Sequence, residues 1–500
     1  MKTSTKVAKE ATITFVGMGF GDAMRYLFTM LLARLVGVEY LGIYSLANSV
    51  TRLAEVFGKA GLDSGILRYV SMRQGTGDYL GIQQDVYSTL KLGLIFSLLV
   101  MSVQVLLSDW LISSVFHGSS LLQTVIIINA ITLPFTVFTL IAAHATQGFK
   151  LLKYKVFVTN LLAPGVLLMT MIAAYFLISA EMAIILPTVV SAVVGFFVIL
   201  GFLKQLTGVH FSQVLRVRFD LEILRFSYPL MFVAVIDTFM HWMDIIMLGY
   251  FTDTRTVGLY HPAARMAGLV RITLVALMSI SGPMLSEFFA QKKQQEMSDL
   301  YKLVVRWIMT LTLPIAVLLV IFPYKTMLLF GGQYMQAATV LLVLTIATLI
   351  QSFTTVGGTT LTVTGYPKVN LINSVIVVVI NVILNIVWIP VYGIMGAAYA
   401  TLASMTILGV LRYVEVWYLV KMHPFCWKLL KPVMACVFTY LMLRMVKPYL
   451  MPFHTLVTLT LAAAITFLCF GAILWLLKFD ADDREVTKAL LMIRKSSKRI

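Results

Sequence analysis

Charged residues and cysteines are scarce in this sequence. Only 12% of the 500 residues are Asp, Glu, Lys or Arg and three are cysteine, whereas 60% are hydrophobic and the mean hydropathy is +0.91. A soluble domain is about half apolar and about a quarter charged. The scarcity of charge therefore excludes an ordinary soluble domain, and the long apolar runs predict an all-α polytopic membrane protein.

The cysteines and acidic residues are also too few for several functions. Cys426, Cys436 and Cys469 lie in or beside apolar segments without CxxC or His-rich spacing, so we expect neither a disulfide framework nor a metal site. Asp and Glu number 22 against 39 Lys and Arg, a net charge of +17. No polar stretch is long enough to form a basic nucleic-acid-binding domain, so we expect no nucleic-acid partner.

Apolar stretches long enough to cross a bilayer, roughly 20 residues each, recur along the whole chain. About fourteen are predicted, near 11–33, 40–62, 88–107, 121–145, 156–178, 181–203, 226–250, 258–284, 303–323, 336–362, 369–390, 394–418, 429–446 and 455–477. The first runs past 20 residues and has no small-residue cleavage site before its charges, which favours a retained span over a signal peptide.

Lys and Arg mark one side of the predicted membrane. They concentrate at the N-terminus, in alternate loops and in the tail that ends IRKSSKRI, whereas the opposite loops hold only Arg34, Arg255, Lys325 and Lys447. Basic residues collect in cytoplasmic loops. We therefore expect a multi-pass protein of the plasma membrane with both termini in the cytoplasm, and we expect the tail to contact solvent or anionic membrane lipids.

The second set of six spans repeats the first at an offset of about 213 to 217 residues. Gly42-Ile43-Tyr44 matches Gly258-Leu259-Tyr260, Gly65 matches Gly282, Gly148 matches Gly365, and Thr188 with Ser191 matches Thr401 with Ser404. Six spans return the chain to its starting side, so the repeats are predicted to be parallel and to enclose a substrate cavity. The predicted divisions are an N-lobe at 1–203, an amphipathic linker at 204–225, a C-lobe at 226–420, two extra spans at 421–478 and a basic tail at 479–500.

Charged residues interrupt the first two spans of each repeat. A charge at mid-membrane costs roughly 2.5 to 3.5 kcal/mol on insertion scales, so such residues usually face a partner or a wet cavity. They are Asp22 and Arg25 on the first span, Arg52, Glu55 and Lys59 on the second, Asp237, His241 and Asp244 on the seventh, and Arg265 and Arg271 on the eighth.

Two interpretations of these charges remain open. They could be ion pairs that tie helices together, as Asp22 with Arg25 or Arg52 with Glu55. The arginines, however, outnumber the carboxylates near them, and guanidinium groups bind phosphate oxygens in a bidentate manner. We therefore predict that Arg25, Arg52, Arg265 and Arg271 line a cavity for an anionic, pyrophosphate-bearing substrate, with interhelical hydrogen bonds as the expected role of Asn370, Asn381 and Asn385.

Several phrases resemble one membrane-transporter superfamily. TGYPKVNLINSVIVVVINVILNIVWIPVYGIMGAAYATLAS is similar to the signature of the tenth to twelfth helices of the multidrug/oligosaccharidyl-lipid/polysaccharide flippases. GLYHPAARMAGLV and PMLSEFFAQKKQQEMSDLYKLVVRW resemble the eighth helix and the loop after it, and GLDSGILRYVSMRQGTGD resembles the first-half counterpart. The resemblance covers about residues 5 to 480 and is specific for the polysaccharide transporter branch.

The resemblance implies a V-shaped, two-lobed bundle that is not an enzyme. It would move an undecaprenyl- or dolichyl-linked oligosaccharide pyrophosphate to the outer leaflet by alternating access, with arginines of the first, second and eighth helices, here Arg25, Arg52 and Arg265, in the cavity. An ion gradient of Na⁺ or H⁺ would drive it, because the sequence has no P-loop for ATP. Asp22, Asp237 and Asp244 are the coupling candidates, and polysaccharide polymerases or glycosyltransferases are the implied protein partners of a monomer.

Two other functions compete with this prediction. A cation-coupled drug antiporter of the same superfamily would need an acidic or aromatic cavity, which the excess of arginine disfavours and the aspartates favour. A membrane glycan polymerase or glycosyltransferase would need catalytic groups on a sizeable external loop, and every external loop here is predicted to be short. A non-transporting scaffold would leave the buried charges without a purpose.

Overall fold

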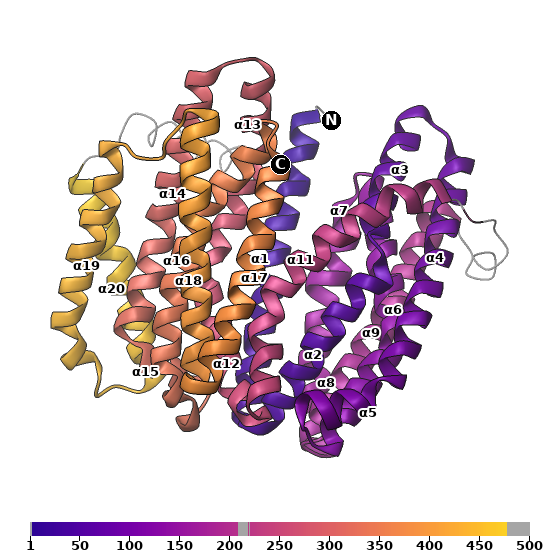
Figure 1. Cartoon of the computed structure of the whole chain (residues 1–500), viewed down its shortest axis with the longest axis horizontal. Helices are drawn as coiled ribbons and strands as arrows, with labels where there is room; N and C mark the ends of the chain where they lie inside the picture. Colours follow the sequence, from indigo (N-terminus) through magenta and orange to yellow (C-terminus); the bar gives the residue numbers. More distant parts are fainter. Residues whose placement is uncertain (1–2, 209–218, 220, 478–500) are drawn as a thin grey trace. The chain divides into compact units, whose positions relative to one another are not determined.

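The computed structural model describes residues 3–208, 219 and 221–477, and within them every regular element is a helix (Figure 1). Half of the predicted linker at 204–225 and the whole tail at 479–500 fall outside the described residues. At the edges of the predicted linker, one helix runs on to Thr207 and the next begins at Leu221. The predicted fold class, an all-α membrane protein, is confirmed for the described chain.

The first half of the chain is built of long helices with short breaks. Its elements are α1 (Thr3–Leu35), α2 (Val38–Lys59), α3 (Leu62–Thr76), α4 (Tyr79–Leu106), α5 (Ser108–Trp110), η1 (Leu111–Phe116), α6 (Ser120–Gly148), α7 (Leu152–Val156), η2 (Phe157–Leu162), α8 (Ala163–Leu177) and α9 (Met182–Thr207). The short helix α3 was not predicted. Its residues belong to the segment GLDSGILRYVSMRQGTGD, in which the sequence showed only a family resemblance. It begins after Ala60 and Gly61, which both have positive φ and so end α2.

The second half continues with helices of similar length. Its elements are α11 (Leu221–Phe251), α12 (Thr254–Ala267), η3 (Gly268–Arg271), α13 (Ile272–Ala290), α14 (Gln294–Ile321), α15 (Pro323–Leu328), η4 (Gly332–Ala337), α16 (Ala338–Val363), α17 (Pro367–Tyr392), α18 (Ile394–Glu415), η5 (Val416–Val420), η6 (Trp427–Leu429), α19 (Leu430–Leu450) and α20 (Thr455–Leu476). The predicted eighth span is therefore broken at Gly268–Arg271.

The internal repeat is visible in where the helices begin. α2 and α12 begin 216 residues apart, α4 and α14 215 apart, α7 and α17 215 apart, and α9 and α18 212 apart. The turns repeat as well, because Lys150 after α6 and Gly365 after α16 both have positive φ and lie 215 residues apart. The structural counterpart of Gly365 is thus Lys150, two residues after the Gly148 that the sequence matched to it. The two halves thus contain the same series of helices, as the sequence matches predicted.

Eleven helices within the described residues are long and apolar enough to cross a membrane. The other three predicted spans fall on α1, α2 and the pair α12 and α13, which carry most of the predicted cavity charges. Fourteen spans are compatible with this arrangement. The chain is accordingly a multi-pass membrane protein.

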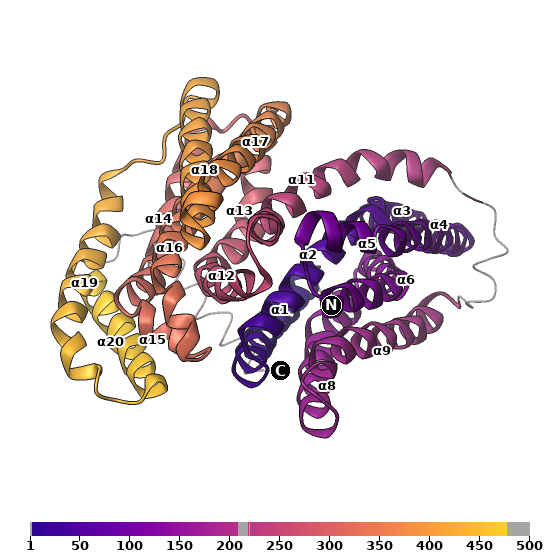
Figure 2. The same ribbon diagram turned by 60° about the horizontal axis from the view of Figure 1, so that its bottom comes forward.

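The helices form two compact units. One comprises Met1–Arg265, Phe330–Val340 and Ser374–Thr401, and the other comprises Met266–Leu329, Leu341–Asn373 and Leu402–Ile500. The first has a core between α3, α4, α6, α9 and α11, centred on Phe138 and Ile141. In the second, α19 and α20 lie side by side and pack on α14 through residues such as Leu443 and Val317 (Figure 2). The lobe boundaries predicted from the sequence stay a prediction.

Candidate functional site

A cavity of about 310 Å³ lies in the first unit, among α1, α2, α6, η2, α8, α9, α11 and α12. Arg25, Arg52 and Arg265 line it, and its lining contains no Asp or Glu. The other polar groups on its wall are neutral and include the hydroxyls of Thr136 and Thr188. Three helices, the consecutive α1 and α2 and the distant α12, therefore each contribute one guanidinium to the same space.

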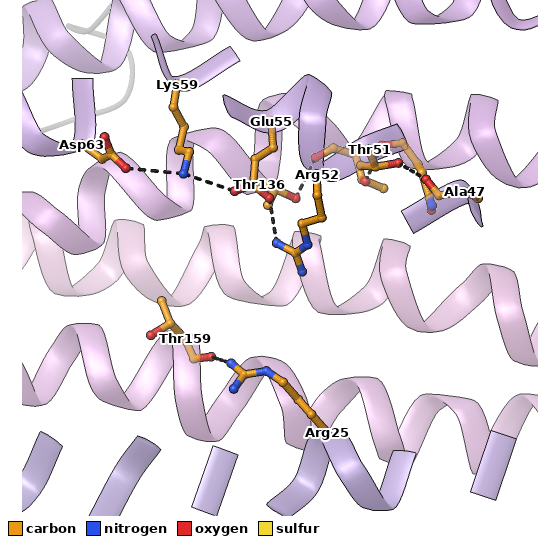
Figure 3. Close-up of polar contacts among 11 residues, drawn as sticks. Arg25, Ala47, Thr51, Arg52, Glu55, Lys59, Asp63, Thr136 and Thr159 are labelled. Carbon is orange, nitrogen blue, oxygen red and sulfur yellow. Dashed lines mark hydrogen bonds and ion pairs between the residues drawn. The ribbon is translucent and has the colours of Figure 1, made fainter. Parts of the chain in front are cut away.

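Arg25 is held in place by two acceptors. Its guanidinium donates to Oδ1 of Asp22 at 3.0 Å. It also donates to the main-chain carbonyl of Thr159 at 2.9 Å (Figure 3). Thr159 lies in the π-helical segment η2, and Pro164, five residues later, has no N–H with which to satisfy that carbonyl. The proline and the π-helix thus leave an oxygen free for the arginine, which positions the guanidinium at the cavity wall.

Arg52 belongs to a row of alternating charges. It donates to Glu55 at 2.8 Å, and Lys59 lies 3.4 Å from both Glu55 and Asp63 (Figure 3). The side chain of Arg52 is 48% exposed, whereas that of Glu55 is 8% exposed. Glu55 is therefore buried between two cations, and the outer face of the Arg52 guanidinium remains accessible from the cavity.

Arg265 has no carboxylate partner among the described residues. Its guanidinium lies over the ring of Tyr26, 4.9 Å from the centroid, and the Tyr26 hydroxyl donates to the main-chain carbonyl of Arg265 at 3.0 Å. Its Nε is buried without a hydrogen-bond partner. A guanidinium that is held by an aromatic ring and has an N–H group without a hydrogen-bond partner is well suited to bind an oxyanion.

The cavity is therefore electropositive. The charges of Arg25, Arg52 and Arg265 are close enough to repel one another, and within the described chain only Asp22 and Glu55 pair with them directly. Equal numbers of cations and carboxylates in the wall would make the cavity neutral. Here the wall holds three arginines, and the two carboxylates that pair with them lie outside the lining. An anion in the cavity would relieve this repulsion.

Asp244 occupies a separate polar cluster in the same unit. Its carboxylate accepts hydrogen bonds from Tyr260 at 2.7 Å, from Asn385 at 3.1 Å and from Thr401 at 2.5 Å. Asn385 also donates to Asn381 at 3.0 Å, while its own Oδ1 is buried without a partner. In residues 3–208 and 221–477 no three His, Cys, Asp or Glu side chains gather as in a transition-metal site. The cluster instead combines one carboxylate with neutral oxygens.

The remaining predicted site residues lie elsewhere. Asp237 and His241 are exposed on α11, and the His241 ring packs edge-on against Trp242. Arg271 lies in η3 and belongs to the second unit, outside the lining of this cavity. The structure thus brings Arg25, Arg52 and Arg265 together, with Asp22, Glu55 and Lys59 beside them, and separates Asp244.

Sequence reasoning missed several residues of the cavity wall. His261 is buried and Trp242 is half-buried, and both line the cavity with Asn48. His261 precedes Arg265 by four residues and so shares its helix face, a spacing that could have identified it. Tyr26 carried no signal, because a tyrosine in an apolar span is commonplace.

Comparison with known proteins identifies a family for this chain and several relatives. The model of a family described as polysaccharide biosynthesis protein matches residues 31–339. Over 175 residues the chain is 30% identical to the probable low-salt glycan biosynthesis flippase Agl15 of Haloferax volcanii, which covers 35% of this chain and 37% of that protein. The match thus spans little more than a third of that relative.

Solved structures match over almost the whole chain. A lipid II flippase MurJ in an inward closed conformation superposes with a TM-score of 0.72 at 16% identity, covering 92% of this chain and 98% of that one. An inward-facing multidrug resistance MATE family transporter of the MOP superfamily gives 0.70 at 14% identity, covering 82% and 98%. These likenesses establish a shared fold, and the superfamily resemblance predicted from the sequence is confirmed.

Proposed function

Because this chain belongs to the polysaccharide biosynthesis protein family, we propose that it is a flippase for a polyprenyl-diphosphate-linked oligosaccharide. It moves its substrate from the cytoplasmic to the outer leaflet of the plasma membrane for surface polysaccharide synthesis. The observation that carries the proposal is the cavity lined by Arg25, Arg52 and Arg265 without a carboxylate in its wall. The probable flippase Agl15, named for low-salt glycan biosynthesis, supports the same substrate class.

A diphosphate fits the chemistry of this cavity. It carries its negative charge on several oxygens around two phosphorus atoms, and three guanidinium groups from three helices can each contribute donors to them. The neutral hydroxyl and amide groups of Thr136, Thr188 and Asn48 suit the hydroxyl groups of the adjoining sugar. The polyprenyl chain, in contrast, has no need of the cavity and can remain in the bilayer.

A drug antiporter is the less well supported function. Its cationic substrates would meet three arginines and no carboxylate in this cavity, at a Coulombic cost. The carboxylate of Asp244 lies outside the cavity lining. This position favours a role for Asp244 in ion coupling over a role in binding a cationic substrate.

The transport step also needs an energy source. We assign ion coupling to Asp244, because its carboxylate, the unpartnered Oδ1 of Asn385 and the hydroxyl of Thr401 are oxygen ligands of the kind that bind H⁺ or a hard monovalent cation. The chain would work as a monomer with both termini in the cytoplasm, and would deliver its product to a polysaccharide polymerase or glycosyltransferase.

The test measures lipid-linked oligosaccharides in cells. The gene is deleted in its host, the lipids are extracted, and their glycans are identified by mass spectrometry. Wild type, Arg25→Gln and Arg34→Gln are restored in parallel, since Arg34 lies on the same helix outside the cavity lining. We expect a polyprenyl-linked repeat unit to accumulate on the cytoplasmic side, and to be cleared by wild type and by Arg34→Gln.

Two outcomes would contradict the proposal. If nothing accumulates and the surface polysaccharide is unchanged, the protein is not this flippase, and sensitivity to toxic cations tests the antiporter. If Arg25→Gln clears the lipid as well as wild type does at equal protein level, the arginine cavity is not the substrate site. Chain extension by the purified protein would instead indicate a polymerase.

A further inference from the structure

A second and larger cavity, of about 820 Å³, lies in the second unit. It is bounded by α14, α16, α18, the start of α19 and the connecting segment 423–430. Its wall is mostly apolar and includes Val305, Met309, Phe353 and Val433. The volume lies within the range of about 300 to 1,000 Å³ that is typical of small-molecule sites.

One arginine enters this apolar space. The side chain of Arg412 lies over Gly357 and Gly358 of α16, and a Cβ on Gly358 would lie 2.8 Å from Cζ of the guanidinium. The Nε of Arg412 donates to Oδ1 of Asn370 at 3.2 Å. The two glycines therefore leave room for the Arg412 side chain, and Asn370 fixes its position at the cavity wall by a hydrogen bond.

The charge of Arg412 is not matched by a direct ion pair in the described chain. Glu415, one turn further along, attracts the guanidinium through space, but it accepts a hydrogen bond from Asn373 and does not reach ion-pair distance of Arg412. The guanidinium has five N–H donors, of which the structure occupies one. Its terminal nitrogens are thus available to a ligand in the cavity.

The mouth of the cavity has the composition of a membrane interface. The segment from Lys421 to Lys431 carries three lysines, and Trp427 and Phe425 on the cavity wall are 90% and 61% exposed. Tryptophan beside lysine is characteristic of the headgroup level of a bilayer. The cavity therefore combines an apolar interior and one arginine with an aromatic rim, and the three lysines stand on the segment that carries this rim, outside the cavity lining.

We propose that this cavity binds an anionic phospholipid of the surrounding membrane, with the headgroup phosphate on Arg412 and an acyl chain against Met309, Phe353 and Val433. The lysines of the segment that carries the rim complement the negative headgroup, as in basic pockets between membrane helices. The site holds the α18–α19 connection in place and is separate from the arginine cavity of the first unit. The proposal does not depend on the identity of the transported substrate.

The experiment counts lipids on the purified full-length protein. Delipidated protein in neutral detergent is titrated with phosphatidylglycerol or phosphatidylcholine, and bound lipids are counted by native mass spectrometry. Arg412→Gln removes the phosphate ligand, Val433→Trp fills the cavity, and Arg444→Gln removes an exposed arginine of α19 outside it. Melting temperatures without lipid verify that each variant folds.

We expect one phosphatidylglycerol to bind wild type and Arg444→Gln with equal affinity. Arg412→Gln should bind it about tenfold more weakly, because the charge-assisted hydrogen bond to the phosphate is lost, and Val433→Trp should lose it. Equal binding by all four proteins would show nonspecific attraction to the basic surface and overturn the proposal. Displacement of phosphatidylglycerol by a polyprenyl phosphate at lower concentration, dependent on Arg412, would assign the cavity to the transported lipid and also overturn it.

Discussion

Gly42 and Gly258 pack reciprocally where α2 meets α12. A Cβ on Gly42 would overlap the main-chain carbonyl of Thr254, and a Cβ on Gly258 would overlap that of Val38. Thr254 follows Val38 by the same 216 residues by which Gly258 follows Gly42. Each helix thus contacts the other through equivalent residues, as two repeats related by an axis along the membrane normal should.

Replacing either glycine should destabilise the protein. Gly258→Ala has to separate two helix backbones, which costs about 1 to 3 kcal/mol as overpacking. Gly165→Ala is the matched control, because nothing lies within 4 Å of a Cβ at that helical position. We expect a lower melting temperature for Gly258→Ala and an unchanged or higher one for Gly165→Ala, and equal melting temperatures would disprove the close contact.

Glu55 should matter more for stability than either of its partners. Glu55→Gln leaves Arg52 and Lys59 without their shared carboxylate. Loss of one member of a fully buried ion pair costs about 3 to 5 kcal/mol, and we expect a smaller loss here because the side chain of Arg52 is 48% exposed. Lys59→Met in the same protein should restore part of the loss, because one uncompensated cation is removed. Chemical unfolding of the single and double variants measures this, and strict additivity would argue against the charge row.

Asp244→Asn should uncouple transport without weakening substrate binding. The variant keeps the size of the side chain and loses the charge, and Asp244 lies outside the lining of the arginine cavity. We expect lipid-linked oligosaccharide to accumulate in cells with this variant, while the purified protein still binds it. Asp237→Asn, at an exposed position two turns earlier on the same helix, tests the other aspartate that the sequence indicated for coupling and should transport normally.

Most of the fold could be predicted from the sequence, because a segment that crosses lipid must be a long apolar helix. Matching residues such as Gly42 and Gly258 also revealed the internal repeat. The breaks could not be predicted. The 3₁₀ turn at Gly268–Arg271 and the π-helix at Phe157–Leu162 do not interrupt the apolar pattern. They depend on tertiary contacts, as when the guanidinium of Arg25 takes up the carbonyl of Thr159.

The candidate site was predictable in part for the same reason. A charge in an apolar span is conspicuous, so Arg25, Arg52 and Arg265 were found from the sequence. Arg271 follows Arg265 by six residues and gave the same signal, but the 3₁₀ turn sets it apart from the cavity lining. Tyr26 and Thr159 contribute a ring and a main-chain carbonyl, which no sequence pattern identifies.

The loop between α3 and α4 should weaken at low pH. Asp78 caps α4 by accepting from the N–H of Gly81 at 2.9 Å, and also accepts from Arg73 at 2.6 Å, and both bonds lower the pKa of its carboxyl. Because the pKa of Asp78 is lower in the folded protein than in the unfolded chain, where it is about 3.9, its ionised carboxylate stabilises the fold above that pH. This stabilisation is lost as the pH falls below the unfolded pKa and through the folded pKa. Asp78→Asn retains the cap without the charge. Melting temperatures between pH 6 and pH 3 should therefore fall more for wild type than for this variant.

Arg265 should not be replaceable by lysine. The guanidinium lies over the Tyr26 ring with Nε free, and an ammonium group cannot bind two phosphate oxygens as a planar fork. We expect Arg265→Lys to transport lipid-linked oligosaccharide roughly tenfold more slowly than wild type, since loss of such contacts is worth about 1 to 2 kcal/mol.

Tyr26→Phe keeps the ring and loses the hydroxyl that donates to the Arg265 carbonyl, so it should retain more activity than Tyr26→Ala. Both are measured with reconstituted protein and a labelled polyprenyl-diphosphate sugar, alongside unchanged folding by melting temperature. Full activity of Arg265→Lys would show that the cavity requires only a positive charge at this position and would remove the argument from guanidinium geometry.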